Sequence, residues 1–459
     1  MGSGAERGIS PGAGGDATRP GAGPLATARA SVGGPAEVNG SAPMLETSSP
    51  STTEVDASAP GPVPSTTEVS VLAPGPVPDS AEAGELGGDL SANPDRSAID
   101  DPATTSAASP RRLTRRPARP TIALLAATAV LLLAVLVSSL GGAAGLPVLG
   151  TTEALLDKLP FVDIHTGLGP VQLSVLNEIR LPRVVLATLV GALLAQAGAA
   201  YQGVFRNPLS DSGTIGASAG AGMAATLVIV YGGGPEHTVA GIGAVPLAAF
   251  VGALGGVLAS YVLGTLVGRG GTASLILAGV AVSSFVGAVQ TFVMQRSTAD
   301  VRQVYSWLFG SFAASDWSLV RLALPYAVIS VLIVSVHARH LDVLALGDDE
   351  AATLGLHPVR TRLIVLAAAS LATATAVAVS GIIGFVGLVV PHVVRRVAGP
   401  GHRLLLPMSL LVGGAFLVLA DLLARTALAP AELPIGVVTS FVGAPFFLVI
   451  LRATRERDR

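Results

Sequence analysis

Long apolar segments joined by short polar links fill the chain from about Thr121 to Arg452. An α-helix rises about 1.5 Å per residue, so roughly 20 apolar residues cover the ~30 Å hydrocarbon core of a bilayer. The first segment, TIALLAATAVLLLAVLVSSLG, carries no charge. The pattern predicts an all-α, multi-pass membrane protein of about ten transmembrane helices. Their approximate limits are 121–141, 182–203, 213–231, 244–267, 273–294, 317–337, 360–380, 382–398, 403–424 and 434–452.

Many of these segments are rich in glycine and alanine. Examples are GALLAQAGAA at 191–200, GASAGAGMAA at 216–225 and GALGG at 252–256. Lipid gives helices no hydrophobic reason to associate, so close backbone approach at small residues supplies the packing. The composition predicts a tightly packed bundle, and it is also compatible with the lining of a wide, weakly adhesive pathway.

The amino-terminal part of the chain is of a different kind. Residues 1–110 are rich in Gly, Ala, Ser, Thr and Pro and contain a 14-residue duplication in which PSTTEV and APGPVP each occur twice. Such a composition cannot bury enough apolar surface to fold, and it lacks the basic start and apolar core of a signal peptide. We interpret 1–110 as a disordered cytoplasmic extension, with a short interaction motif as the alternative, and 111–459 as the transmembrane domain.

The arginines give an orientation, because cytoplasmic links carry an excess of Lys and Arg. Both flanks of the apolar region are basic, which predicts that both termini are cytoplasmic and that the number of spans is even. The flanking arginines are Arg111, Arg112, Arg115, Arg116 and Arg119 before the first span and Arg452, Arg455, Arg457 and Arg459 at the end of the last.

Composition excludes several kinds of chemistry. The sequence contains no cysteine, so disulfides, thiolate metal sites and cysteine catalysis are absent. The lysine Lys158 does not follow a glycine, so the chain has no G-x-x-x-x-G-K-[ST] loop with which to bind ATP. No His or carboxylate cluster has metal-ligand spacing, so we expect no metal site. A net charge of -2 gives no reason to expect a nucleic-acid partner.

The predicted spans contain one acidic residue, Asp421, near the expected outer end of its helix. An ion-coupled carrier needs carboxylates within the membrane, and these spans do not supply a relay. Asp421 and Arg425 stand four apart on one helix, a spacing that favours mutual pairing. A transporter with neither an ATP site nor a proton relay needs an external source of energy. An ion-coupled secondary transporter is the alternative, and a membrane-embedded enzyme would need a polar constellation at depth.

One predicted cytoplasmic link is a candidate for attaching that source. Residues His340 to Arg362 mix leucines with three consecutive acids. The pattern predicts two short amphipathic helices, at about 341–358, broken at Gly347 and Gly355. A helix lying on the lipid surface is the alternative, but three acids facing an anionic leaflet oppose it. We therefore expect this link to dock to a soluble partner.

Six blocks of the sequence together resemble the FecCD-type permeases of bacterial ABC importers, which carry ferric siderophores, haem and cobalamin. The resemblance runs from about residue 120 to the end, in the family's order. The blocks are RLPRVVLATLVGALLAQAGAAYQGVFRNPLSDSGTIGASAGA (180–221), LILAGVAV (275–282), WLFGSF (307–312), LGDDEAATLGL (346–356), GIIGFVGLVVPHVVRR (381–396) and LADLLARTALAPAELPIGVVTSFVGAPFF (419–447).

The resemblance implies the type II ABC importer permease fold, with ten helices per subunit, in the bacterial inner or plasma membrane. It implies a homodimer, or a heterodimer with a second permease, bound to two ABC ATPase subunits and to a substrate-binding protein outside. The chain itself would then be no enzyme and hold no cofactor, since ATP and Mg would be bound by the partner ATPase.

The resemblance also implies roles for particular residues. Outward-facing arginines of the family receive carboxylates from the binding protein, and snorkelling anchors are the alternative; here these are Arg180, Arg183 and Arg425. The family's ATPase-coupling helix corresponds to Gly347, Asp348, Asp349, Glu350, Ala351, Leu354 and Gly355. Its cytoplasmic gate corresponds to Thr272, Ala273 and Ser274, which any tight turn could also use, and its broken eighth helix to Gly384, Gly387 and Pro391.

The function that follows from the resemblance is inward movement of an iron–siderophore complex, powered by ATP that a separate subunit hydrolyses. Iron–siderophore is preferred because it is the family's commonest substrate class, and haem and cobalamin are the alternatives. We expect the complex to pass along small side chains rather than to be held by a ligand set.

Overall fold

The computed structural model describes residues 120–455 except 143–144, 159–163, 233–237, 240–241, 269–271 and 298. The predicted extension, residues 1–110, lies outside the described residues.

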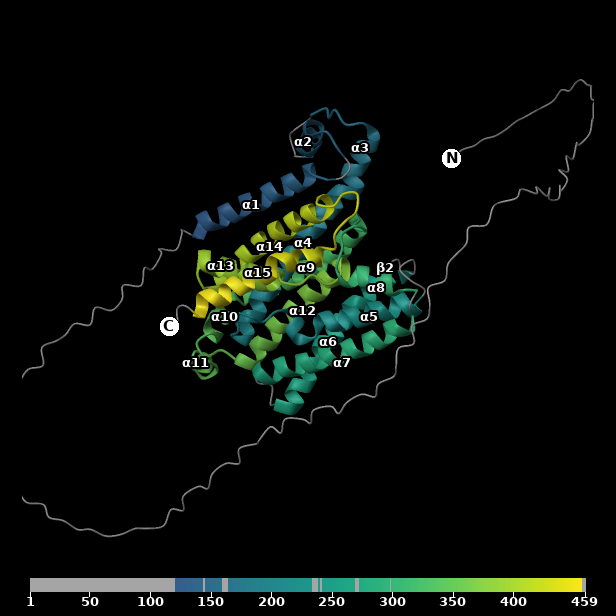
Figure 1. Cartoon of the computed structure of the whole chain (residues 1–459). Coiled ribbons are helices and arrows are strands. Elements are labelled where there is room, and N and C mark those ends of the chain that lie inside the picture. Colours follow the sequence, from purple (N-terminus) through teal and green to yellow (C-terminus); the bar gives the residue numbers. More distant parts are fainter. Residues whose placement is uncertain are drawn as a thin grey trace, which may run out of the picture. The chain divides into compact units, whose positions relative to one another are not determined.

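The described chain is built almost entirely of helices (Figure 1). The longer ones are α1 (Pro120–Leu140), α4 (Leu181–Phe205), α5 (Ala217–Tyr231), α6 (Ala244–Gly268), α7 (Thr272–Arg296), α9 (Trp317–Val336), α12 (Pro358–Ser380), α13 (Val386–Ala398), α14 (His402–Thr426) and α15 (Ile435–Arg455). The shorter ones are α2 (Val148–Leu156), α3 (Pro170–Ser174), the π-helix η1 (Val175–Arg180), the 3-10 helix η2 (Ser212–Ile215), α8 (Val301–Leu308), α10 (Ala338–Leu344) and α11 (Asp348–Thr353). Strands β1 (Thr238–Val239) and β2 (Ile242–Gly243) form one small antiparallel pair.

The ten longer helices occupy the ten ranges that the hydrophobic pattern predicted, so the all-α, multi-pass fold is confirmed. Among the described residues, seven helices are long and apolar enough to cross a membrane. Helix α5 and the apolar part of α15, Ile435–Val449, are shorter. Helix α13 has 13 residues, or about 20 Å at 1.5 Å per residue. The predicted span 382–398 is therefore helical only in its second part.

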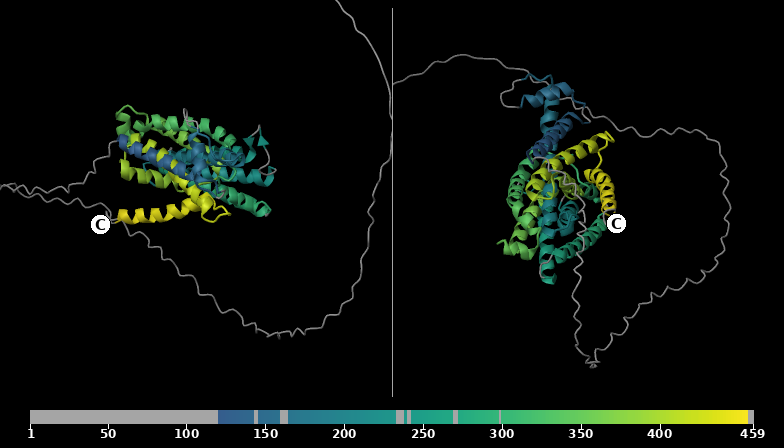
Figure 2. Two further views of the ribbon diagram at one scale, coloured as in Figure 1. Left: turned by 90° about the horizontal axis from the view of Figure 1, so that it is seen from above. Right: turned by 90° about the vertical axis from the view of Figure 1, so that its left-hand side faces the viewer.

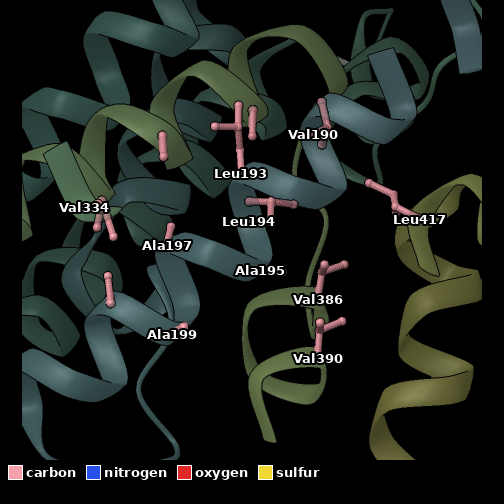
Figure 3. Close-up of a cluster of buried hydrophobic side chains, with 14 of the residues drawn as sticks. Val190, Leu193, Leu194, Ala195, Ala197, Ala199, Val334, Val386, Val390 and Leu417 are labelled. Atoms are coloured by element: carbon pink, nitrogen blue, oxygen red, sulfur yellow. The ribbon is translucent and has the colours of Figure 1, made fainter. Parts of the chain in front are cut away.

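Helix α4 lies at the centre of the bundle, buried along most of its length. It packs against α14, α12, α13 and α9, and α5 packs against α6 in a neighbouring group. Figure 3 shows Leu193 and Leu194 of α4 among Val386 of α13 and Leu417 of α14, all within one buried cluster. Helix α15 lies at the edge of the bundle (Figure 2) and keeps an apolar face exposed, with Phe441 as an example. The central helix is thus lined by protein and the peripheral ones present apolar side chains outward.

Glycine sets the spacing of the central helices. A Cβ on Gly191 would lie 2.3 Å from the Gly413 carbonyl oxygen, and one on Gly198 would lie 1.9 Å from the carbonyl oxygen of Gly387. Backbones approach this closely only where no side chain intervenes. The tight packing predicted from the small residues is therefore confirmed at α4, α13 and α14.

Candidate functional site

The predicted acidic link folds as two short helices, α10 and α11, between α9 and α12. Gly347 before α11 has a φ of +144°, and Gly355 after it has a φ of +81°. Both angles lie in the region that glycine adopts readily. The two helices and their glycine breaks are thus present where the sequence placed them, and we call 338–355 the link.

Asp348 fastens the link to the bundle. Arg362 of α12 donates from Nη1 to Asp348 Oδ2 at 2.8 Å, and its Nη2 and the guanidinium of Arg206 both donate to Oδ1. Arg206 ends α4 in the left-handed region and also donates from Nε to the Leu344 carbonyl at 2.7 Å. These hydrogen bonds, chiefly those from Arg362, hold the pKa of Asp348 below its ordinary value of 3.8. Asp348 therefore holds the link to α4 and α12 within the protein.

Other predicted coupling residues differ in their exposure. Ala351 is fully buried, whereas Asp349 and Glu350 are exposed. Leu354 is 65% exposed and Leu346 is 64% exposed, so the link presents two leucines beside two acids. Exposed leucines and acids on one short segment suit a surface that binds another protein.

The predicted gate residues begin helix α7. Thr272 lines a cavity of about 120 Å³ whose wall also contains Phe205, Tyr261 and Arg362. Ala273 and Ser274 follow in the first turn. Arg362 therefore belongs both to the wall of this cavity and to the hydrogen bonds that hold Asp348 of the link.

Of the three residues predicted to break the helix, one lies in the break that the structure shows. Residues 381–385 are not helical, and the backbone turns at Gly381 (φ +72°) and Phe385 (φ +68°). Gly384 lies in this segment, but Gly387 and Pro391 lie inside α13. We correct the location of the break accordingly, because Gly387 provides close contact with Gly198 rather than a bend.

The three predicted docking arginines lie at the other end of α4 and are buried, between 4% and 8% exposed. Oxygens of the chain itself hold these side chains. Arg180 donates from Nη1 to the Ser139 and Leu140 carbonyls at 3.1 and 3.2 Å, and Arg425 donates from Nη2 to the Ser138 carbonyl at 2.5 Å. Their role in docking stays a prediction.

Asp421 is the centre of this second cluster. It is 0% exposed and accepts from Arg183 Nη2 at 2.8 Å and Nε at 3.0 Å. Arg425 Nε lies 3.4 Å from its other oxygen, so the predicted Asp421–Arg425 pair is present. A buried carboxylate needs such cationic partners, because burial removes it from water.

Glu432 completes the cluster and was not singled out from the sequence. Both its oxygens accept from Arg183, at 2.8 and 3.0 Å, while its side chain stays 39% exposed. It lies in the connection between α14 and α15, 249 residues from Arg183 in the chain. Residues so far apart in the sequence cannot be paired from their spacing, because the turn after α14 brings Glu432 to Arg183 only in the folded protein. Among the described residues, no group of three or more His, Asp or Glu side chains forms a candidate metal site.

Comparison with known proteins adds an independent line of evidence. The model of the FecCD transport family matches residues 130–453. The cobalamin import system permease protein BtuC of Halobacterium salinarum is 43% identical over 68% of this chain and 81% of its own length. The Fe(3+)-citrate import system permease protein YfmE of Bacillus subtilis is 36% identical over 74% of this chain and 98% of its own.

A solved structure is similar over the same region. It is an inward-facing metal-chelate type ABC transporter, with a TM-score of 0.61 and 29% identity. The likeness covers 73% of this chain and 99% of that chain.

Proposed function

The chain belongs to the FecCD transport family and is a multi-pass permease of an ABC importer, and from this premise we propose that it moves an iron–siderophore complex into the cytoplasm. ATP hydrolysed by a separate subunit supplies the energy. The observation that carries this proposal is the link, which presents Leu346 and Leu354 beside Asp349 and Glu350 on a chain whose sequence has no phosphate-binding loop.

The chemistry of the relatives' substrates supports a bulky chelate as cargo. Relatives are named for Fe(3+) dicitrate in Escherichia coli and for iron(3+)-hydroxamate in Bacillus subtilis. Such cargo arrives already coordinated, so the pathway needs no metal ligands of its own. Cobalamin is the second candidate, because the Halobacterium salinarum relative named for it shares 43% identity with this chain.

The assembly we propose contains two permease subunits, two ABC ATPases and an external substrate-binding protein, in a bacterial inner or plasma membrane. The link seats in the ATPase, so the end of α4 at Arg206 is cytoplasmic, as are both termini. Arg180, Arg183 and Arg425, at the far end, receive the binding protein. Thr272, Ala273 and Ser274 form the cytoplasmic gate, and 381–385 lets α13 change its angle as the ATPases close.

A reconstituted system tests the function. The permease is placed in liposomes with its cognate ABC ATPase and substrate-binding protein, and uptake of a ferric hydroxamate, ferric citrate, haemin and cyanocobalamin is measured. We expect ATP-dependent uptake of the ferric chelates. Uptake of cyanocobalamin alone would show that the substrate is cobalamin and not an iron chelate. Uptake driven by a proton gradient without the ATPase would overturn the whole proposal.

The coupling surface is tested by charge reversal. Asp349→Arg with Glu350→Arg should abolish co-purification of the ATPase, because it places two cations on an acidic docking surface. The matched control is Glu178→Arg, an exposed acid at the opposite end of the bundle. If the double variant still co-purifies with the ATPase, the link is not the coupling surface.

A further inference from the structure

Pro391 leaves a backbone group of α13 without its usual partner. A proline has no N–H, so the carbonyl four residues earlier, that of Gly387, loses its intrahelical hydrogen bond. Pro391 is buried inside α13 rather than at its first turn. Gly387 is half-buried. A carbonyl shielded from water without a partner destabilises the fold, and another donor is therefore expected near Gly387.

That donor comes from another helix. The side-chain amide of Gln202, in the last turn of α4, donates from Nε2 to the Gly387 carbonyl at 3.2 Å. Its other atom, Oε1, accepts from Arg395 Nη1 of α13 at 2.5 Å. Gln202 is only 3% exposed. The amide nitrogen and the amide oxygen of this one buried side chain thus both bind α13, on either side of Pro391.

The same turn of α4 also holds the link. Gly203, the next residue, lies against His402 of α14, since a Cβ there would lie 2.7 Å from His402 Nε2. His402 in turn donates its backbone N–H to Asp342 of α10 at 2.7 Å. Arg206 binds Asp348 and the Leu344 carbonyl. One helical turn, 202–206, therefore contacts α10, α11, α13 and α14.

Helix α13 is poised to transmit displacement. Its amino-terminal end follows the non-helical segment 381–385, and Phe385 packs against α15, where a Cβ on Gly443 would lie 2.4 Å from the Phe385 ring. Its contact with α4 continues along Val386 and Val390, which Figure 3 shows beside α4. Helix α13 is therefore held to α4 by packing along its first turns and by the hydrogen bonds of Gln202 on either side of Pro391.

We propose that Gln202 is a positioning residue that joins movement of the link to movement of α13, by replacing the N–H that Pro391 lacks. This rests on the proposed function, in which the link receives the force of ATP hydrolysis. Without Gln202 the ATPase still docks and hydrolyses ATP, but α13 is held to α4 by packing alone and follows the link less closely, so transport per ATP falls.

The experiment compares Gln202→Leu with Gln196→Leu in the reconstituted importer. Gln196 is the matched control, because it is a buried glutamine of the same helix that bonds to Ser335 of α9 instead. We expect Gln202→Leu to lower substrate transported per ATP by about fivefold or more, the lower range of an allosteric coupling. Gln196→Leu should leave this ratio unchanged. An unchanged ratio in Gln202→Leu would overturn the inference.

A rescue variant separates positioning from mere satisfaction of the carbonyl. In Gln202→Leu with Pro391→Ala, the new N–H restores the bond to Gly387 within α13. We expect the melting temperature to recover in part, since Arg395 still lacks its acceptor, and the transport ratio to stay low, because the hydrogen bonds from Gln202 to α13 are still absent. Full recovery of the ratio would show that Gln202 only satisfies the backbone. If the wild-type importer shows no ATP-driven uptake at all, the proposed function fails first, and that result is distinct from either outcome.

Discussion

The two ends of α4 use the same chemistry in opposite settings. At one end Asp421 is 0% exposed between Arg183 and Arg425, and at the other the side chain of Asp348 is 46% exposed between Arg206 and Arg362. A buried ion pair cannot lose one partner without leaving a charge in a medium of low dielectric, whereas an exposed pair is screened and exchanges with water. We therefore expect the ion pairs around Asp421 to stay in place, and those around Asp348 to break and re-form when the link moves.

Removing Asp421 should have the largest effect. Asp421→Ala leaves Arg183 and Arg425 buried without their common carboxylate, and loss of one partner of a buried pair costs about 3–5 kcal/mol. We expect a strongly lowered apparent melting temperature in detergent. Asp349→Ala, which removes an exposed carboxylate, is the control and should melt like the wild type. Equal melting of both variants would contradict the contrast between the two ends.

The centre of α4 should respond next, by steric overlap. Gly198→Ala places a methyl group 1.9 Å from the Gly387 carbonyl oxygen, so α13 must move away from α4. Overpacking of this kind costs about 1–3 kcal/mol or more. Gly255→Ala on α6 is the matched control, since no atom lies within 4 Å of its added Cβ. The yield of monodisperse protein and its melting temperature report the difference, and comparable values for the two variants would refute the close contact.

Glu432 gives a prediction about docking. It covers Arg183 while remaining 39% exposed, so it, and not Asp421, is the carboxylate that an arriving partner can replace. Glu432→Gln keeps the shape and removes the competing charge, and we expect tighter binding of the substrate-binding protein at low salt, by about fivefold, or ~1 kcal/mol. Surface plasmon resonance on nanodiscs measures it, with Glu178→Gln as control. Weaker binding would mean that Glu432 itself is part of the docking surface.

How far the sequence alone could lead depends on the range of the interaction. The ten helices, the close packing at small residues and the breaks at Gly347 and Gly355 follow from local patterns, and the structure contains them. The arginine motif was recognised, but the burial of Arg183 was not, because its partners stand 238 and 249 residues away. Likewise, Pro391 signals a missing hydrogen bond, but only the packed bundle brings Gln202 to it.

The smallest effect is expected at Asp348, and it depends on pH. The pKa of Asp348 is lowered in the folded protein, chiefly by Arg362, so its carboxylate stabilises the fold above the ordinary value of 3.8 and this contribution is lost as the pH falls through the lower, folded value. Because the side chain is exposed, Asp348→Asn should cost only about 0.2–1 kcal/mol at neutral pH.

The measurement compares the melting temperatures of wild type and Asp348→Asn from neutral pH downward, at low and at high salt. The two should differ slightly above pH 3.8 and converge below that pH, with a smaller difference at high salt. At Asp421 salt should have little effect, since screening reaches buried pairs poorly. A difference at Asp348 that salt leaves untouched would mean that this cluster is as fixed as the one around Asp421, and that the link does not adjust when its partner binds.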